Sequence, residues 1–279
     1  PSELTPNTSQ LVENIITRVF KKEHVSVIQG DAKVATELLA QKWDYIFFTG
    51  SVLVGKIVAK AAAEHLTPVT LELGGKSPCI IDETVDLKLV SKRLVWAKFL
   101  NAGQTCIAPD YILVKSEIKN ELISALKAEL IRAYGENPKQ SKDYPRIVNL
   151  KNLSRLLKML EDSKIAFGGN VDEKDCYLSP TIIDEPDINS EVMKDEIFGP
   201  ILPILSYDTE DDIKSIISKY DKPLAFYVFS DNKSFSKKIT TFNKLGKEYP
   251  IIVQQYLSDR RNKEGISKIF VRSETNGKL

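Results

Sequence analysis

Two residues in this chain have the side chains needed for covalent catalysis. Cys106 lies in the run NAGQTCIAPDY, and Glu72 lies upstream in the run LELGGK. Apolar residues spaced by three or four predict a helix over 87–100 with Gly103 as its stop signal, which places Cys106 on a turn. A thiol attacks as its thiolate, so it needs a lowered pKa or a base that removes its proton. We therefore predict Cys106 as a nucleophile and Glu72 as its carboxylate base.

The helix that precedes Cys106 does not help to activate it. A helix C-terminus carries partial negative charge, which disfavours a thiolate close by. Activation must come from other backbone amides, from a bound cationic cofactor or from Glu72, and the sequence leaves these three sources open. Base rates also favour plainer roles, in which Glu72 faces solvent from a strand and Cys106 is an inert turn cysteine.

Composition indicates an ordinary globular protein with more than one compact unit. The 279 residues are 42% hydrophobic and 28% charged, with a formal net charge of +1. This charge gives no field that would attract nucleic acid, so we expect no nucleic-acid partner. No stretch approaches the roughly 18 apolar residues that span a bilayer, so we expect no membrane segment.

The cysteines and histidines argue against disulfides and metals. Cys79, Cys106 and Cys176 are odd in number and widely separated, which favours a reducing, cytoplasmic location over a disulfide framework. His24 and His65 are the sole histidines, and no cysteine pair has ligand spacing, so we predict no metal site.

Alternating strand-like and helix-like segments predict an α/β fold with a parallel sheet flanked by helices. The expected helices cover 9–21, 32–41, 54–65, 87–100, 117–134, 211–219 and 233–244, and the expected strands cover 25–30, 45–48, 79–81, 111–114, 201–207 and 224–230.

One strand-to-helix turn, at Gly50 and Ser51, has the character of an anion site. It leads into a predicted helix, whose first backbone amides can face a phosphate. Gly50 and Gly55 alone are a weak signal, because the full G-x-G-x-x-G fingerprint is missing. A P-loop reading of the later Gly-Lys-Ser fails, because Thr70 stands where that motif needs glycine.

Four motifs in order resemble the aldehyde dehydrogenase family, and within it the fatty-aldehyde or class-three branch. They are FTGS followed by VG at 48–55, LTPVTLELGGKSP at 66–78, GQTC with APDY at 103–111, and EIFGP at 196–200. The likeness runs from Pro1 to about Leu245. It implies an incomplete Rossmann-like cofactor domain at 1–75, an α/β catalytic domain at 76–245, and an atypical tail at 246–279.

The resemblance also implies an NAD cofactor, with NADP as the alternative. Glu196 resembles the family's ligand of the nicotinamide ribose, and Phe198 lies beside the nicotinamide ring in such enzymes. Without the resemblance, Glu196 would be a solvated loop residue and Phe198 a core residue. The implied cofactor-binding residues are Glu3, Thr49, Gly50, Ser51, Val54, Gly55, Leu73, Gly74, Glu196 and Phe198.

The implied reaction is oxidation of a medium- or long-chain aliphatic aldehyde to the carboxylic acid. Cys106 attacks the carbonyl to give a thiohemiacetal, hydride passes to the nicotinamide, and Glu72 activates the water that cleaves the thioester. In such enzymes the oxyanion is held by the nucleophile's own amide and by an asparagine side chain.

The chain ends predict a truncated relative of this family. The resemblance places the family's first cofactor-domain strands, its oxyanion asparagine and a ribose-binding lysine before Pro1. The 246–279 tail lacks the family's closing strands, and we hypothesise a frameshift, altered splicing or a mispredicted gene, with a divergent native extension as the rival. Intact relatives form homodimers, so we expect impaired dimerisation here, giving monomers or aggregates.

Two alternative functions stay open: an inactive fragment that acts as a binding or assembly partner, and a residual cysteine-dependent esterase.

Overall fold

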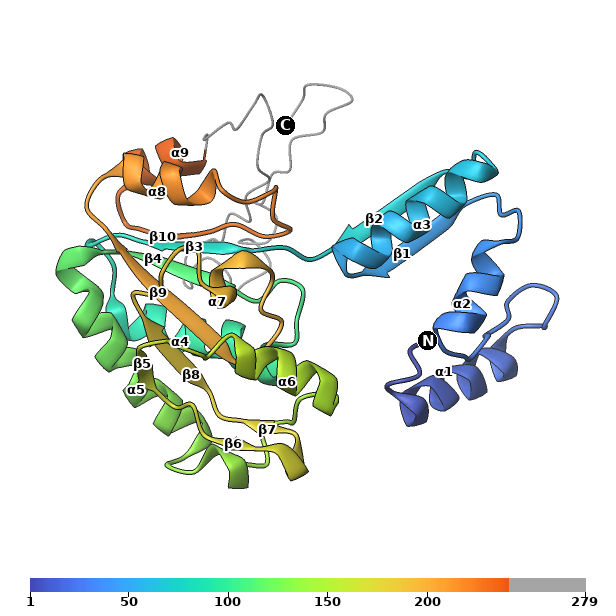
Figure 1. Ribbon diagram of the computed structural model, residues 1–279, viewed down its shortest axis with the longest axis horizontal. Helices are drawn as coiled ribbons and strands as arrows, with labels where there is room; N and C mark the ends of the chain where they lie inside the picture. The colour runs from blue at the N-terminus through green and yellow to red at the C-terminus, as the bar shows by residue number, and fades with distance from the viewer. Residues whose placement is uncertain (241–279) are drawn as a thin grey trace, which may run out of the picture.

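The computed structural model describes residues 1–240. The predicted tail at 246–279 and the end of the predicted 233–244 helix lie outside the described residues. Figure 1 shows a smaller amino-terminal unit, which we define as residues 1–75, beside a larger carboxy-terminal unit, residues 76–240. A single extended segment after strand β2 joins the two units.

The amino-terminal unit contains a two-stranded parallel sheet, β1 paired with β2. Gly55 lies where helix α3 approaches β2, because a Cβ on this glycine would lie 2.7 Å from Leu73 Cδ2. The Ser51 side chain caps α3 by accepting a hydrogen bond from Val54 N at 3.3 Å. The elements are α1 (Pro6–Val19), α2 (Ala32–Leu39), β1 (Ile46–Gly50), α3 (Val52–Glu64) and β2 (Val69–Leu73).

One predicted strand of this unit is wrong. Residues 25–30 form no strand, and Val25 and Ile28 are exposed. A strand needs a neighbour for its backbone N–H and C=O groups. Within the described part of the chain, β1 pairs with β2 alone and leaves 25–30 without a ladder to join.

The carboxy-terminal unit is built on a six-stranded sheet in the order β10-β3-β4-β9-β8-β5. Every neighbouring pair is parallel except β5 with β8. The strands are β3 (Pro78–Ile81), β4 (Tyr111–Lys115), β5 (Ile165–Phe167), β8 (Thr181–Asp184), β9 (Ile201–Tyr207) and β10 (Tyr227–Phe229), with a separate hairpin of β6 (Val171–Asp172) and β7 (Tyr177–Leu178). The α-helices are α4 (Leu87–Phe99), α5 (Lys119–Tyr134), α6 (Leu150–Lys158), α7 (Glu191–Lys194), α8 (Glu210–Ile217) and α9 (Lys233–Thr240), and the short 3-10 helices are η1 (Leu100–Gly103), η2 (Ser116–Ile118), η3 (Pro138–Gln140) and η4 (Glu173–Asp175).

The core lies on both faces of this sheet. Successive strand residues point to opposite faces, so Ile80 joins one buried cluster while its neighbours Cys79 and Ile81 join the other. Helices α4 and α5 cover the second cluster, and α6 and α8 contribute to the first. Continuous apolar strands of this kind are typical of parallel sheets buried on both faces. The predicted α/β fold is therefore confirmed, and Cys79 is buried in its core.

Candidate active site

Cys106 lies on a tight turn, as the sequence predicts. Helix α4 ends at Phe99, and the next residues reverse the chain, with Asn101 and Ala102 both in the left-handed region at φ 52°. Ala108 N then donates to Thr105 O at 3.0 Å, which makes Cys106 a central residue of that turn. Within residues 1–240 the Cys106 amide has no hydrogen-bond acceptor. An unpaired amide on the nucleophile is free to donate to a developing oxyanion.

A tyrosine that the sequence analysis missed lies beside this turn. Tyr227, on β10, donates a hydrogen bond from its hydroxyl to Ile107 O at 2.5 Å. Burial, together with the nearby thiols of Cys79 and Cys106, raises the pKa of Tyr227 to about 12. Strand β10 therefore supports the turn from the edge of the sheet. The residue was predicted simply as part of a strand, because its long-range contact leaves no mark in the local pattern.

Three motif loops meet at two glycines. A Cβ on Gly74 would lie 2.2 Å from Glu196 Oε1, so the Glu196 carboxylate rests against the Gly74 backbone. A Cβ on Gly103 would lie 2.2 Å from Gly199 O, so the cysteine loop packs on the loop that carries Glu196. At Gly103 the obstacle is backbone, so this glycine admits no side chain, whereas a Cβ on Gly74 would displace the end of the Glu196 side chain. The LGGK, GQTC and EIFGP motifs thus form one site.

Glu196 is a half-buried acid in this site. Burial raises its pKa, whereas a hydrogen bond from the Gly75 amide and the charges of Lys98 and Arg155 lower it. Phe198 follows in the left-handed region at φ 46° and is 42% exposed. A bulky residue rarely adopts this conformation, and such strain concentrates at functional sites.

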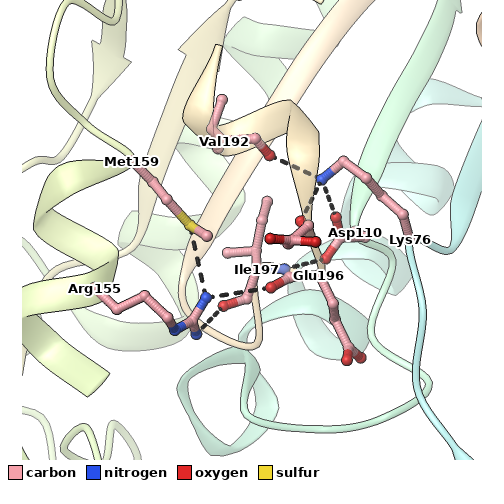
Figure 2. A network of polar contacts seen from close by, with 8 residues as sticks. Lys76, Asp110, Arg155, Met159, Val192, Glu196 and Ile197 are labelled. Carbon is pink, nitrogen blue, oxygen red and sulfur yellow. Dashed lines mark hydrogen bonds and ion pairs between the residues drawn. The ribbon is translucent and has the colours of Figure 1, made fainter. Parts of the chain in front are cut away.

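A buried ion pair holds the Glu196 loop in place. Lys76 Nζ donates to Asp110 Oδ2 at 2.5 Å, to Val192 O at 2.8 Å and to Asp195 O at 3.0 Å. Asp110 Oδ1 accepts from Ile197 N at 2.8 Å, as Figure 2 shows. The sequence analysis assigned neither Lys76 nor Asp110 a role, although both lie inside the quoted motifs. The sequence signal that could have revealed them is a charged residue placed just before an apolar run, as at 78–81 and 111–114.

Lys98, on α4, is a second buried lysine near this pair. Its side chain is 1% exposed, and burial lowers its pKa to about 8. The charge of Lys76 also lowers this pKa, whereas Asp110 and Glu196 raise it. The Glu196 loop therefore lies above a cluster of buried charges of both signs.

The remaining predicted residues lie mainly on the amino-terminal unit. Glu72 is exposed on β2, opposite Thr49 of β1, and no hydrogen bond joins it to Cys106. The Gly50 backbone ends β1, where Ser51 begins α3. Glu3 is exposed in the turn before α1, and within residues 1–240 no hydrogen bond or ion pair joins it to the other predicted residues. The structure therefore gathers Gly74 and Glu196, with Phe198 close to them in the chain, and among residues 1–240 it records no hydrogen bond from Glu3 or Glu72 to the Cys106 turn.

Sequence comparison matches residues 1–248 to the Aldehyde dehydrogenase family. Aldehyde dehydrogenase family 3 member A2 of Pongo abelii is 48% identical over 239 residues, which cover 86% of this chain and 49% of that protein. The 4,4'-diaponeurosporen-aldehyde dehydrogenase of Staphylococcus aureus is 47% identical over 241 residues, which cover 86% of this chain and 52% of that protein. This chain spans about half the length of the curated relatives it matches.

Solved structures agree with the sequence match. The substrate-bound AldH of Staphylococcus aureus superimposes with a TM-score of 0.85 at 45% identity, over 90% of this chain and 55% of that one. The aldehyde dehydrogenase of Mycobacterium tuberculosis complexed with NAD+ gives a TM-score of 0.76 at 30% identity, over 86% of this chain and 52% of that one. With its motifs meeting in one site, this chain belongs to the aldehyde dehydrogenase family.

Proposed function

We propose that this protein oxidises an aliphatic aldehyde to the carboxylic acid with NAD or NADP. The observation that carries the proposal is the meeting of three loops, in which the Cys106 turn packs through Gly103 on the loop bearing Glu196. The relatives named above are aldehyde dehydrogenases, and one structural relative is complexed with NAD+. We assign residues 1–75 to a partial dinucleotide-binding domain and residues 76–245 to the catalytic domain.

The chain has groups that suit a dinucleotide. Half-buried Glu196 accepts hydrogen bonds, as a carboxylate does from ribose hydroxyls, and it rests against the Gly74 backbone. The first turn of α3, capped by Ser51, presents backbone amides to a phosphate, with Thr49 and Gly50 leading into it. Gly55 and Leu73 hold α3 close to β2 beneath that turn. Phe198 offers a partly exposed ring beside Glu196.

The chemistry of this chain's own residues then follows. The Cys106 thiolate attacks the aldehyde carbon and forms a thiohemiacetal, whose oxyanion accepts a hydrogen bond from the Cys106 amide. When bound, the nicotinamide cofactor supplies the acceptor for the hydride that leaves this carbon. Loss of the hydride leaves a thioester, which a water molecule attacks while Glu72 takes a proton from that water. The Cys106 thiol is then released together with the carboxylic acid.

A cavity of about 550 Å³ lies between α4 and α5, with Trp96 and Leu100 exposed along it by 67% and 46%. Lys92, Arg93, Glu129, Arg132 and Asp143 also line it, so its walls are mixed in character. The proposal of an aliphatic substrate therefore rests on the relatives named above and not on this cavity.

Aldehyde-dependent reduction of NAD and of NADP by the full chain tests the proposal. We expect Cys106→Ala to abolish turnover, whereas Cys176→Ala, at a half-buried cysteine that ends η4, matches the parent. Glu72→Gln is expected to slow steady-state turnover, because thioester hydrolysis needs the base. A first hydride transfer that keeps the parent rate would show that Glu72 is not the group that activates the Cys106 thiol. Equal activity of the two cysteine variants would refute the assignment of the nucleophile.

Two further results distinguish the alternatives. Hydrolysis of 4-nitrophenyl acetate that is lost in Cys106→Ala but indifferent to NAD identifies an esterase. A folded chain without turnover in either assay identifies an inactive fragment that acts through binding.

Within residues 1–240, no helix combines the length and apolar character that crossing a bilayer requires.

A further inference from the structure

Arg155 reaches from α6 to the backbone of the loop that carries Glu196 and Phe198. Its Nη1 donates to Glu196 O at 3.2 Å and its Nη2 donates to Ile197 O at 2.5 Å, as Figure 2 shows. We propose that Arg155 is a positioning residue for the cofactor: it fixes the backbone of 196–198 so that the Glu196 carboxylate and the Phe198 ring face a nicotinamide ribose. This inference rests on the proposed function.

The Arg155 guanidinium has the shape needed to hold two neighbouring backbone carbonyls. A guanidinium presents planar, forked donors, whereas a lysine ammonium is a point charge on a flexible stem. Two consecutive carbonyls, of Glu196 and Ile197, match the fork. Burial lowers the pKa of Arg155, and the charges of the Asp110, Glu196 and Asp195 carboxylates offset part of that shift. The Arg155 Nη atoms nevertheless donate to the backbone carbonyls of Glu196 and Ile197. Arg155 therefore fixes the backbone of the loop in addition to balancing its negative charge.

The bond to Ile197 O acts on the strained residue next in the chain. Ile197 O belongs to the peptide group that directly precedes Phe198, so holding this oxygen holds the plane from which Phe198 departs at φ 46°. A bulky left-handed residue persists only where its surroundings determine it. In the preceding peptide group, which joins Glu196 to Ile197, Ile197 N donates to Asp110 Oδ1. Arg155 and Asp110 thus grip Ile197 from two directions.

The next residue of α6 holds the far end of the loop. A Cβ on Gly199 would lie 2.5 Å from Leu156 Cδ2, so Leu156 packs directly on Gly199. Leu156 is itself fully buried. Neighbouring residues of one helix therefore contact the loop before and after Phe198. Because α6 is anchored in the core, it gives the loop a rigid reference.

The test compares Arg155→Lys and Arg155→Met in the full chain with Arg146→Lys as a matched control. Arg146 also donates to two backbone carbonyls, Tyr144 O at 3.2 Å and Lys139 O at 2.8 Å, away from Glu196. We expect calorimetry to show NAD binding about tenfold weaker in both Arg155 variants, the effect of losing roughly one charged hydrogen bond. The KM for cofactor is expected to rise by the same factor while the KM for aldehyde stays unchanged.

Two measurements without cofactor separate positioning from general damage. Hydrogen exchange over residues 195–199 is expected to speed up in the Arg155 variants, and alkylation of Cys106 by iodoacetamide is expected to keep the parent rate. If Arg155→Met does not fold, Arg155→Lys carries the test. Unchanged NAD affinity in both variants, or an equal loss in Arg146→Lys, would overturn the role of Arg155. A parent chain that binds no NAD would instead refute the proposed cofactor site, while the exchange data would still show whether Arg155 holds the loop.

Discussion

The two units follow the same alternation of strand and helix but differ in how much they bury. In the carboxy-terminal unit, β3, β8 and most of β4 and β9 are buried on both faces. Within residues 1–75, the buried apolar side chains are Val58 and Ala62, while large apolar residues of α1 and β1 are exposed. Alternation therefore specifies which elements form, whereas burial depends on how many strands and helices are layered together.

The difference also concerns polar groups. The carboxy-terminal unit buries Lys76, Asp110 and Lys98, and it satisfies the first two with hydrogen bonds to each other and to backbone. Titratable side chains of the amino-terminal unit remain at the surface or half-buried. Buried charges need a surrounding core that excludes water and holds their partners. Charge burial is thus a second mark of the better-packed unit.

The largest expected effect on stability comes from removing Asp110 of the carboxy-terminal unit, and Asp31 of the amino-terminal unit provides the comparison. Asp110→Ala is expected to lower the free energy of unfolding by about 3–5 kcal/mol, because it leaves Lys76 buried and unpaired. Asp31→Ala, which removes the exposed N-cap of α2, is expected to lower it by about 1 kcal/mol. Urea titration of both variants measures the contrast. Similar losses in the two variants would break the comparison between the units.

Apolar truncations sharpen the same contrast. Leu126→Ala, at a fully buried position of α5, is expected to cost about 2–5 kcal/mol of unfolding free energy through lost burial and a cavity. Ile15→Ala, at a residue of α1 that is 52% exposed, is expected to stay within about 0.5 kcal/mol. Chemical denaturation followed by circular dichroism compares them. A large loss in Ile15→Ala would show that α1 is packed in solution.

A pH series tests the buried charge on Lys98. In the unfolded chain this lysine titrates near 10.5, whereas in the folded chain its pKa is about 8. Between these values the unfolded chain binds more protons, so the stability of the parent is expected to rise with pH, on the order of 3 kcal/mol in total. We expect Lys98→Met to lose this rise and Lys92→Met, an exposed lysine of the same helix, to keep it. A rise that persists in Lys98→Met would contradict the assignment.

The smallest expected difference between paired variants comes from two glycines with positive φ. Gly103 has φ 72° and meets Gly199 O, whereas Gly135 has φ 80° and no atom within 4 Å of an added Cβ. Both alanine variants lose about 1–2 kcal/mol to backbone strain. Gly103→Ala is expected to lose about 1–3 kcal/mol more through the backbone clash, and to lose aldehyde turnover. Melting curves of the two variants that coincide would show that the cysteine loop does not pack on Gly199.

Local patterns predicted much of this fold. The apolar spacing before Gly103 placed α4 and the Cys106 turn, and the run of apolar residues at 201–207 placed β9. Helix α6 was not predicted, although its leucines recur at helical spacing after the N-cap Asn149. It predicted a strand at 25–30 that the structure lacks, because β-propensity alone does not supply a pairing partner.

Local sequence patterns could not predict the contacts that assemble the site, because those contacts join residues far apart in the chain. Lys76 meets Asp110 across 34 positions and Val192 across 116 positions of the chain. Arg155 meets Glu196 across 41 positions. A local pattern records neither which charges are buried nor what they meet, so the resemblance identified Glu196 while its supports went unnoticed. The roles of Cys106 and Glu72 remain predictions for the assays above.

The segment after β2 has a mechanical consequence. Lys76 is tied to the carboxy-terminal unit by three hydrogen bonds, and just before it Gly74 and Gly75 carry no side chains, with Gly75 at φ 148°. A rotation of one unit against the other about this pair of glycines would leave the Glu196 carboxylate on Gly74 close to the axis. It would therefore keep that contact while α3 and β1 travelled through the larger arc.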